Sequence, residues 1–186
     1  MLHSFSDASG AVERAFVEAF RRDERWMMIS SSPVDALYRA ISREFPERSL
    51  AVDGEERSVV LTAAGLALEG FLPMVGPGSP RLVTRGYDEI RSAVALPSLP
   101  VLLLGSGGGL FRGDLGAPDQ VVEDLALMRA LPGMRVFFPS DALVLAEILA
   151  GPHDGPAYLR WEPWGGDPSG PGGNFPREDL LAGGRI

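Results

Sequence analysis

Two consecutive carboxylates, Glu55 and Glu56, stand where a short apolar run passes through an Asp-Gly turn into a run of small apolar residues. The Asp53-Gly54 pair is typical of a turn, and the residues after it favour a helix. An acidic residue in the first turn of a helix is ordinarily stabilised by the helix dipole. A buried carboxylate instead has a raised pKa, which lets it share a proton with a ligand near neutral pH. Local chemistry therefore leaves a structural and a catalytic interpretation open.

Two further segments place polar or flexible residues directly after an apolar run. The run 26–29 is followed by serines that include Ser31, and the run 100–104 is followed by the Gly-rich segment 105–109, which includes Ser106. Parallel sheets bind ligands at the carboxyl ends of their strands, so both segments are candidates for a substrate edge. The Gly-rich segment lacks a Walker lysine and the Rossmann spacing, which makes phosphate binding the weaker interpretation.

The composition excludes several classes of partner and site. The 186 residues carry 25 Asp and Glu against 17 Lys and Arg, a net charge of −8, so we expect neither nucleic acid nor an anionic membrane as partner. Cysteine is absent and histidine is limited to His3 and His153, which leaves almost no material for thiolate chemistry, Ser-His-Asp catalysis or a histidine metal site. We expect His153, in a Gly-Pro-His-Asp-Gly segment, to lie in a surface turn. Without a signal peptide or a membrane-spanning run, we expect a cytoplasmic protein.

Alternating patterns of hydrophobicity predict the elements that would position these residues. The predicted strands are 26–29, 50–52, 71–75, 100–104, 134–138 and 157–161. The predicted helices are 11–23, 34–45, a helix that begins near Glu55, 85–96, 118–130 and 142–149. Strands that alternate with helices indicate an α/β protein of three layers, αβα, with a mostly parallel sheet covered on both faces. We expect one domain over residues 1–161 and an irregular Gly/Pro-rich tail over residues 162–186.

Several segments, in order along the chain, resemble motifs of one enzyme family. The matches, each followed by the family's pattern, are 45–48 (F-P-x-R), 52–56 (D-V-G-I-A-E), 63–67 (A-A-G-L-A at the family spacing), 85–90 (R-A-Y-D-Q-I), 123–134 (E-D-L-A-x-x-R-x-I-P-N-M) and 138–141 (x-P-S-D). The family is the pyrimidine-binding (Pyr) domain of transketolases and of deoxyxylulose-phosphate synthase. From residue 45 to about residue 160, the resemblance implies the thiamine-diphosphate-binding Pyr fold and thiamine diphosphate as the cofactor.

The resemblance gives the main role to Glu56, which stands at the position of the family's glutamate. That carboxylate hydrogen-bonds N1′ of the cofactor's aminopyrimidine, so Glu56 is the expected catalytic and cofactor-binding residue. Glu55 would point elsewhere, because successive helix residues diverge by about 100°. The expected pocket residues are Leu82, in place of an aromatic residue, and Arg85, at a synthase-like position where a guanidinium can stack on a ring. A solvated helix end is the alternative for Arg85. Tyr87 is either a pocket wall or a core residue.

One segment departs from the family's pattern. Transketolases carry D-G-x-T-H-Q before the E-D-L-A helix, and its histidine helps to handle the ketose. Here the segment 114–120 is one residue longer, Asp119 stands at the histidine position, and Gln120 follows. An ionised carboxylate cannot donate a hydrogen bond, so the donor comes from elsewhere, the substrate differs, or this chain does not handle the sugar. Helix capping is the structural alternative for Asp119. We keep Asp119 and Gln120, with Ser31 and Ser106, as substrate-edge candidates.

The resemblance also implies a partner chain. Complete transketolases bind the pyrophosphate through a G-D-G…N metal motif on another domain, and no segment here resembles it. We expect a split enzyme of α2β2 composition, in which the partner carries the pyrophosphate-binding domain and holds Mg²⁺ or Ca²⁺, with no metal on this chain. The expected reaction moves a two-carbon ketol unit from a ketose phosphate to an acceptor, which we conjecture to be a thiol on an acyl or peptidyl carrier protein. The alternatives are a β subunit of a 2-oxo acid dehydrogenase E1 component and a non-catalytic scaffold of the same fold.

Overall fold

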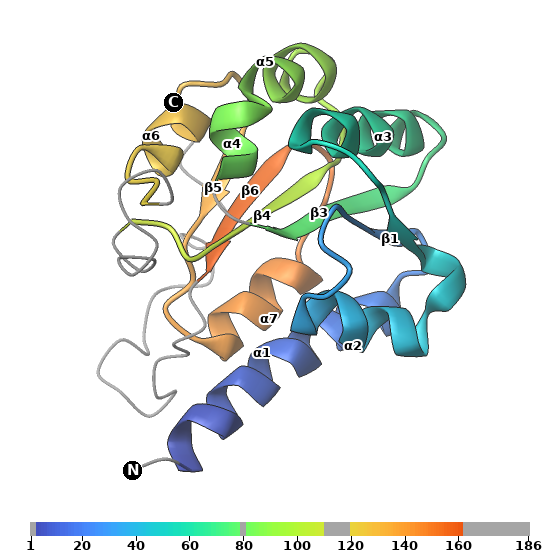
Figure 1. Ribbon diagram of the computed structural model, residues 1–186, viewed down its shortest axis with the longest axis vertical. Coiled ribbons are helices and arrows are strands. Elements are labelled where there is room, and N and C mark those ends of the chain that lie inside the picture. The colour runs from blue at the N-terminus through green and yellow to red at the C-terminus, as the bar shows by residue number, and fades with distance from the viewer. Residues whose placement is uncertain (1–2, 79–80, 110–119, 162–186) are drawn as a thin grey trace.

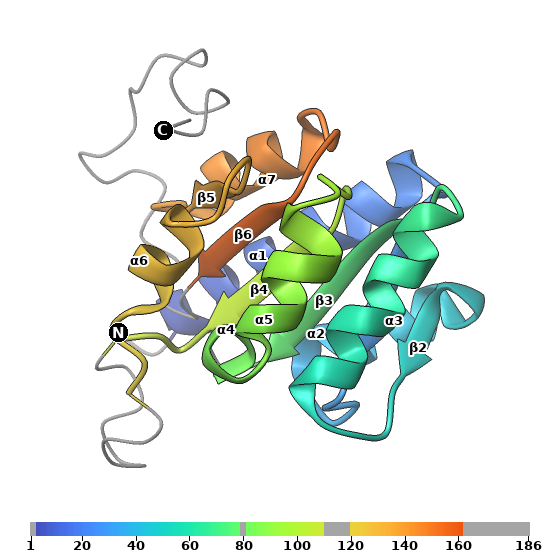
Figure 2. The same cartoon turned by 90° about the horizontal axis from the view of Figure 1, so that it is seen from above.

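The computed structural model describes residues 3–78, 81–109 and 120–161 (Figure 1). The strands in these ranges are β1 (Trp26–Ser30), β2 (Ser49–Ala51), β3 (Leu72–Gly78), β4 (Leu102–Ser106), β5 (Arg135–Phe137) and β6 (Ala157–Trp161). They form one six-stranded sheet in the order β2-β1-β3-β4-β6-β5, and every pair of neighbours is parallel. Figure 2 shows the sheet from above, with helices over it.

Helices cover both faces of the sheet. One face carries α1 (His3–Arg22), α2 (Ala36–Glu44) and α7 (Ala142–Ala150). The other carries α3 (Glu56–Leu68), α4 (Arg81–Arg85), α5 (Tyr87–Glu89), the π-helix η2 (Ile90–Ala95) and α6 (Asp124–Arg129), and a short 3₁₀ turn, η1 (Pro46–Arg48), precedes β2. The predicted three-layer αβα architecture is thus confirmed. The predicted tail, 162–186, lies outside the described residues, so the division at residue 161 stays a prediction.

An apolar core lies on each side of the sheet, because successive residues of a strand point to opposite faces. Along β1, Met28 packs toward α1, α2 and α7, whereas Ile29 packs toward α3 and its neighbours. Phe16 and Phe20, at helical spacing on α1, are fully buried on the first side. On the second side α3 contributes small side chains, which let it lie close to the sheet: Val59, Val60, Ala63, Ala64 and Ala67.

The segment that matches F-P-x-R has a structural role. Arg48 donates from Nη1 to the carbonyls of Phe20, at 2.9 Å, and Asp23, at 3.3 Å. Its guanidinium carbon also lies 4.3 Å from the centre of the Phe45 ring. Arg48 therefore joins η1 to the carboxyl end of α1, where unpaired carbonyls need donors.

The predicted helix 85–96 is divided in the structure. It is interrupted at Gly86, between α4 and α5, and continues as η2. Glycine is a poor helix former, and here it also allows a close approach, since a Cβ at Gly86 would lie 3.5 Å from Cγ2 of Val60 on α3.

Two other predicted elements have different limits. The predicted helix 118–130 is helical only from Asp124, and its first two residues lie outside the described ranges. The predicted strand 100–104 instead extends through Gly105 and Ser106, because β4 continues to pair with β6 at both residues. The start of the Gly-rich segment is therefore part of a strand.

His153, predicted to lie in a surface turn, lies in a loop and is partly buried. The ring packs edge-on against Trp26, with 4.7 Å between the ring centres, and Nε2 lies 3.1 Å from the carbonyl of Leu149. Burial is the main cause that lowers the pKa of His153 below its ordinary value of 6.5.

The parallel sheet brings the carboxyl ends of its strands to one edge. After β1 the chain continues into α2 on one face, whereas after β3 it continues into α4 and α5 on the opposite face. A crevice between neighbouring strands of this kind is the usual ligand site in such sheets. The start of α3, which follows β2, belongs to the same edge.

Candidate functional site

Glu56 is the first residue of α3, at the carboxyl edge of the sheet. The turn before it depends on Gly54, whose φ of +144° is one that other residues rarely adopt. Glu55 is exposed and occupies the N-cap position, but its side chain makes no capping hydrogen bond. The Glu56 side chain is only 24% exposed, and its Oε2 lies 3.5 Å from Nη1 of Arg85. Of the two predicted carboxylates, Glu56 is thus the one that turns toward a neighbouring element.

The short helix α4 supplies two of the predicted pocket residues. Leu82 is buried in the apolar layer that also contains Val60 of α3. Arg85 is the last residue of α4, and its side chain is 51% exposed beside Glu56. The structure therefore brings Arg85 and Glu56 together and places Leu82 in the core behind them.

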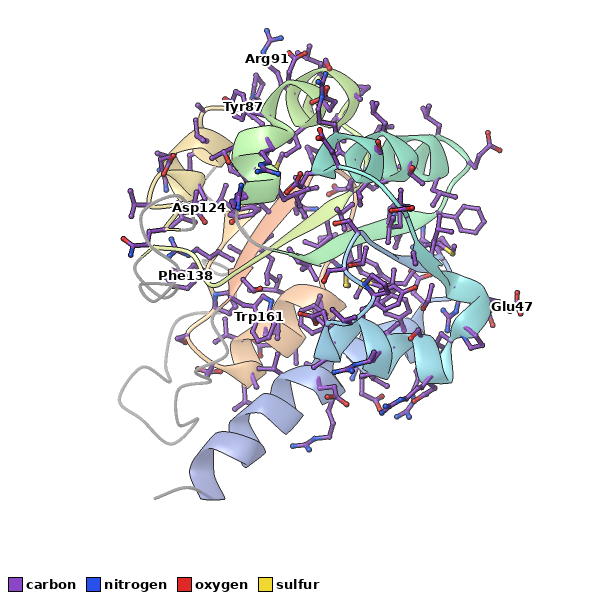
Figure 3. All side chains as sticks on the ribbon, in the orientation of Figure 1. Glu47, Tyr87, Arg91, Asp124, Phe138 and Trp161 are labelled. Atoms are coloured by element: carbon purple, nitrogen blue, oxygen red, sulfur yellow. The ribbon has the colours of Figure 1, made fainter. Side chains whose placement is uncertain are left out.

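Tyr87 connects two helices. It is the first residue of α5, and its hydroxyl donates to the carbonyl of Leu127 on α6 at 3.3 Å (Figure 3). The ring is partly buried against the core of this face. This position corresponds to the core-packing alternative.

A second ion pair joins the first turn of α3 to α5. The Arg57 guanidinium donates from Nε to Oε1 of Glu89 at 2.6 Å, and Nη2 lies at the same distance from that oxygen. Glu89 is only 7% exposed, and Arg57 holds the pKa of its carboxyl below the ordinary value of 4.5. Sequence reasoning missed this pair, although one signal was present: Glu89 stands where the family pattern R-A-Y-D-Q-I has glutamine.

A third charged cluster lies beside the carboxyl ends of β4 and β6. Asp124 is fully buried, accepts a hydrogen bond from the Tyr158 hydroxyl at 2.6 Å, and lies 3.1 Å from Nη1 of Arg160 (Figure 3). The glycines of the Gly-rich segment leave room for these side chains. A Cβ at Gly105 would lie 2.7 Å from Cζ of Tyr158, and one at Gly108 would lie 2.7 Å from Cζ of Arg160. Packing thus accounts for Gly105 and Gly108, and sequence reasoning did not identify this cluster.

The substrate-edge candidates are dispersed along the edge. Ser31 is exposed directly after β1, and Ser106 is buried at the end of β4. These strands are separated by β3, so their ends lie about 10 Å apart. Gln120 is partly buried, and Asp119 lies outside the described residues. The structure therefore does not bring Ser31 and Ser106 together.

The described ranges contain neither a candidate metal cluster nor a membrane-spanning helix. In residues 3–78, 81–109 and 120–161, no three or more His, Asp or Glu side chains are grouped so that they could hold a metal ion. None of the helices in those ranges combines the length and the apolar character needed to cross a membrane.

Comparison with known proteins places the sequence in a family. Residues 7–161 match the family described as transketolase, pyrimidine binding domain. The chain is 37% identical over 164 residues to 1-deoxy-D-xylulose-5-phosphate synthase 1 of Geobacter sulfurreducens, an alignment that covers 87% of this chain and 24% of the synthase. It is 39% identical over 151 residues to the synthase of Anaeromyxobacter dehalogenans strain 2CP-1, over 79% of this chain and 23% of that protein. The chain thus spans about a quarter of the length of these relatives.

Two solved structures share the fold of this chain. A split-gene transketolase, described as an inactive beta4 tetramer, superimposes with a TM-score of 0.72 at 28% identity, over 90% of this chain and 55% of that one. Transketolase from Leishmania mexicana gives a TM-score of 0.77 at 20% identity, over 92% of this chain and 27% of that one, which supports the fold alone. From the match over residues 7–161 and these likenesses, we conclude that the chain belongs to the pyrimidine-binding domain family of transketolases, within the thiamine diphosphate-dependent enzymes.

Proposed function

We propose that this chain is the Pyr-domain subunit of a two-component, thiamine diphosphate-dependent transketolase-like enzyme. The enzyme would transfer a two-carbon ketol unit from a ketose phosphate to an acceptor, for which a carrier-bound thiol is our conjecture. The observation that carries this proposal is the partly buried Glu56 carboxylate, which begins α3 at the carboxyl edge of the sheet beside Arg85.

The residues at this edge fit one half of the cofactor. Glu56 offers an oxygen that can share a proton with a ring nitrogen, Arg85 offers a planar cation, and Leu82 supports both from the core behind them. For the pyrophosphate half, the described residues contain no cluster suited to a metal ion, and the chain has no lysine. This chain would therefore hold the aminopyrimidine, and a partner would hold the pyrophosphate and its Mg²⁺ or Ca²⁺.

Glu56 would act on a proton. When bound, thiamine diphosphate supplies the carbon nucleophile for ketol transfer. The Glu56 carboxylate would hold a shared proton at N1′ of the aminopyrimidine, and a docked partner would exclude the water that still reaches it. Loss of that water favours a shared proton over a free carboxylate. Before the cofactor binds, Arg85 would keep the carboxylate oriented through their contact of 3.5 Å.

A split enzyme needs surfaces for other chains, and α3 offers one. From Ser58 to Leu68 the helix has no charged residue, and its outward side includes Leu61, 50% exposed, and Leu68, 71% exposed. Leucines on the outer side of an uncharged helix are ordinarily covered by another element or chain. Gly65 lies between the two leucines, and a Cβ there would meet no atom within 4 Å, so the stripe offers both a protruding and a receding position. We propose that a second copy of this chain covers α3 in the α2β2 assembly. The beta4 tetramer described for the split-gene relative is consistent with contacts between such copies.

The test is reconstitution with a pyrophosphate-domain chain and comparison of Glu56→Gln with Glu55→Gln. We expect Glu56→Gln to lower kcat by about 10²–10⁴-fold, the usual contribution of a positioned proton-transfer group. The neighbouring variant removes the same charge from an exposed position and should change kcat less than about twofold. Full activity in Glu56→Gln would contradict the proposal and favour the scaffold alternative, whereas CO₂ release from a 2-oxo acid would favour the E1-type alternative.

A further inference from the structure

The first turn of α3 lacks the usual means of fixing a helix start. Glu55 is the N-cap residue, but its side chain accepts no hydrogen bond from the turn. By contrast, Asp35 caps α2 and Asp141 caps α7 with side-chain hydrogen bonds to backbone N–H groups. Since an uncapped turn is more easily displaced, the position of Glu56 depends on what holds the turn from outside.

Two ion pairs hold it, from consecutive residues of α3 to the segment on either side of Gly86. Glu56 contacts Arg85 at 3.5 Å, and Arg57 contacts Glu89 at 2.6 Å. Gly86 lies close enough to this turn that a Cβ there would be 3.9 Å from the Glu56 carbonyl oxygen. These two contacts therefore link the first turn of α3 to the α4–α5 segment, in addition to the apolar packing between them.

The two pairs are not equivalent. Glu56 is the carboxylate that would engage a ligand, and a bound ring would compete with Arg85 for it. Arg57–Glu89 is then the remaining ion pair between this turn and a neighbouring element, within the described part of the chain. Glu89 is nearly buried, and a buried charge is stable only with a partner, whereas the Arg57 side chain is 62% exposed, so Glu89 is the member that depends on this pair.

We propose that Glu89 is a positioning residue that acts through Arg57. The pair fixes the first turn of α3 so that the Glu56 carboxylate keeps its direction when it leaves Arg85 for the aminopyrimidine. This inference rests on the proposed function for the identity of the ligand. The Arg57–Glu89 ion pair does not depend on the identity of the ligand, because its atoms lie 2.6 Å apart within this chain.

The experiment compares Arg57→Gln with the double variant Arg57→Gln/Glu89→Gln. The single variant leaves Glu89 charged and nearly buried without its cation, whereas the double variant carries two neutral amides that can hydrogen-bond each other. Arg21→Gln is the matched control, because Arg21 also joins two helices, α1 and α2, through Glu44 at 2.6 Å on the other side of the sheet.

The first measurement is amide hydrogen exchange of the full chain without cofactor or partner. At Ser58 to Leu61 we expect exchange about three- to tenfold faster in Arg57→Gln, and within about twofold of the unmodified chain in the double variant and the control. The second measurement is kcat of the reconstituted enzyme. We expect it to fall about tenfold in Arg57→Gln, because small displacements of a catalytic group are costly, and to recover in the double variant.

Unchanged exchange in Arg57→Gln would overturn the proposal. So would a lowered melting temperature with unchanged kcat, which would make the pair merely structural. A double variant as impaired as the single one would also overturn it, because the guanidinium itself would then be needed. If the proposed function is wrong, the Glu56→Gln enzyme will be active. The hydrogen-exchange measurement does not depend on that result.

Discussion

His153 makes the stability of this chain sensitive to pH. Its ring packs on Trp26, and burial lowers its pKa below 6.5, so the folded chain binds the proton less readily than the unfolded chain. The contribution of the neutral His153 ring to folding stability is therefore fully present above pH 6.5. It is lost as the pH falls through the lowered pKa of His153.

We predict that His153→Gln removes this pH dependence. Glutamine can still donate to the Leu149 carbonyl, which lies 3.1 Å from Nε2, but it does not titrate. The measurement is the urea midpoint of both proteins at pH about 7.5 and about 5, which brackets the titration of histidine. An equal loss of stability in both proteins would assign the dependence to other groups.

The sequence predicted the position of Glu56 but not the side-chain contacts around it. Glu56 was placed correctly at a helix start because the Asp-Gly turn and the apolar run are local signals. Arg57 with Glu89, and Asp124 with Tyr158, are partners 32 and 34 residues apart, so their contacts depend on how α3 meets α5 and how α6 meets β6. No local pattern encodes such distances.

At the scale of elements, the Gly-rich segment is matched to the strand beside it. A Cβ at Gly105 would lie 2.7 Å from Cζ and 2.9 Å from Cε2 of Tyr158, which is fully buried. Neither the ring nor the strand can move far, because Tyr158 also donates to Asp124.

We predict that Gly105→Ala lowers the free energy of unfolding by about 1–3 kcal/mol, as expected for overpacking a buried site. The measurement is urea denaturation. Gly155→Ala serves as the control, since a Cβ there would meet only Oγ of Ser98 at 3.5 Å, an ordinary contact. Equal stability of the two variants would show that the segment adapts around Tyr158.

The limits of the elements were less predictable than their existence. The order of strands and helices was predicted from short apolar runs, such as the one that forms β4, and from apolar residues at helical spacing, as in α1. The break at Gly86 and the late start of α6 at Asp124 were not predicted from the sequence, because both follow from packing. Gly86 lies against α3, and Asp124 is held by Tyr158 and Arg160 of β6.

At the scale of the whole molecule, the outer side of α3 predicts self-association. We expect Leu61→Glu to shift the chain toward monomer in sedimentation velocity, because a charge would have to be buried at the contact. Leu61 is 50% exposed in the single chain, so the substitution should leave folding nearly unchanged, within about 0.5 kcal/mol.

The control for this prediction is Leu143→Glu. Leu143 is 65% exposed on α7, on the opposite face of the sheet, and its substitution should leave the oligomeric state unchanged. A monomeric unmodified chain, or a Leu61→Glu chain that associates normally, would refute contact through α3. If Leu61→Glu instead abolished only binding of the pyrophosphate-domain chain, that chain would be the one that covers this surface.

The position of β6 has a consequence for synthesis. It is the last of the described strands along the chain, yet it lies between β4 and β5, and β5 pairs with β6 alone among these strands. A nascent chain on the ribosome therefore leaves one flank of β4 open, and keeps β5 unpaired, until residues 157–161 emerge. Truncation before Ala157 would remove a central strand rather than an end, and would leave two strands with exposed edges able to pair with other chains.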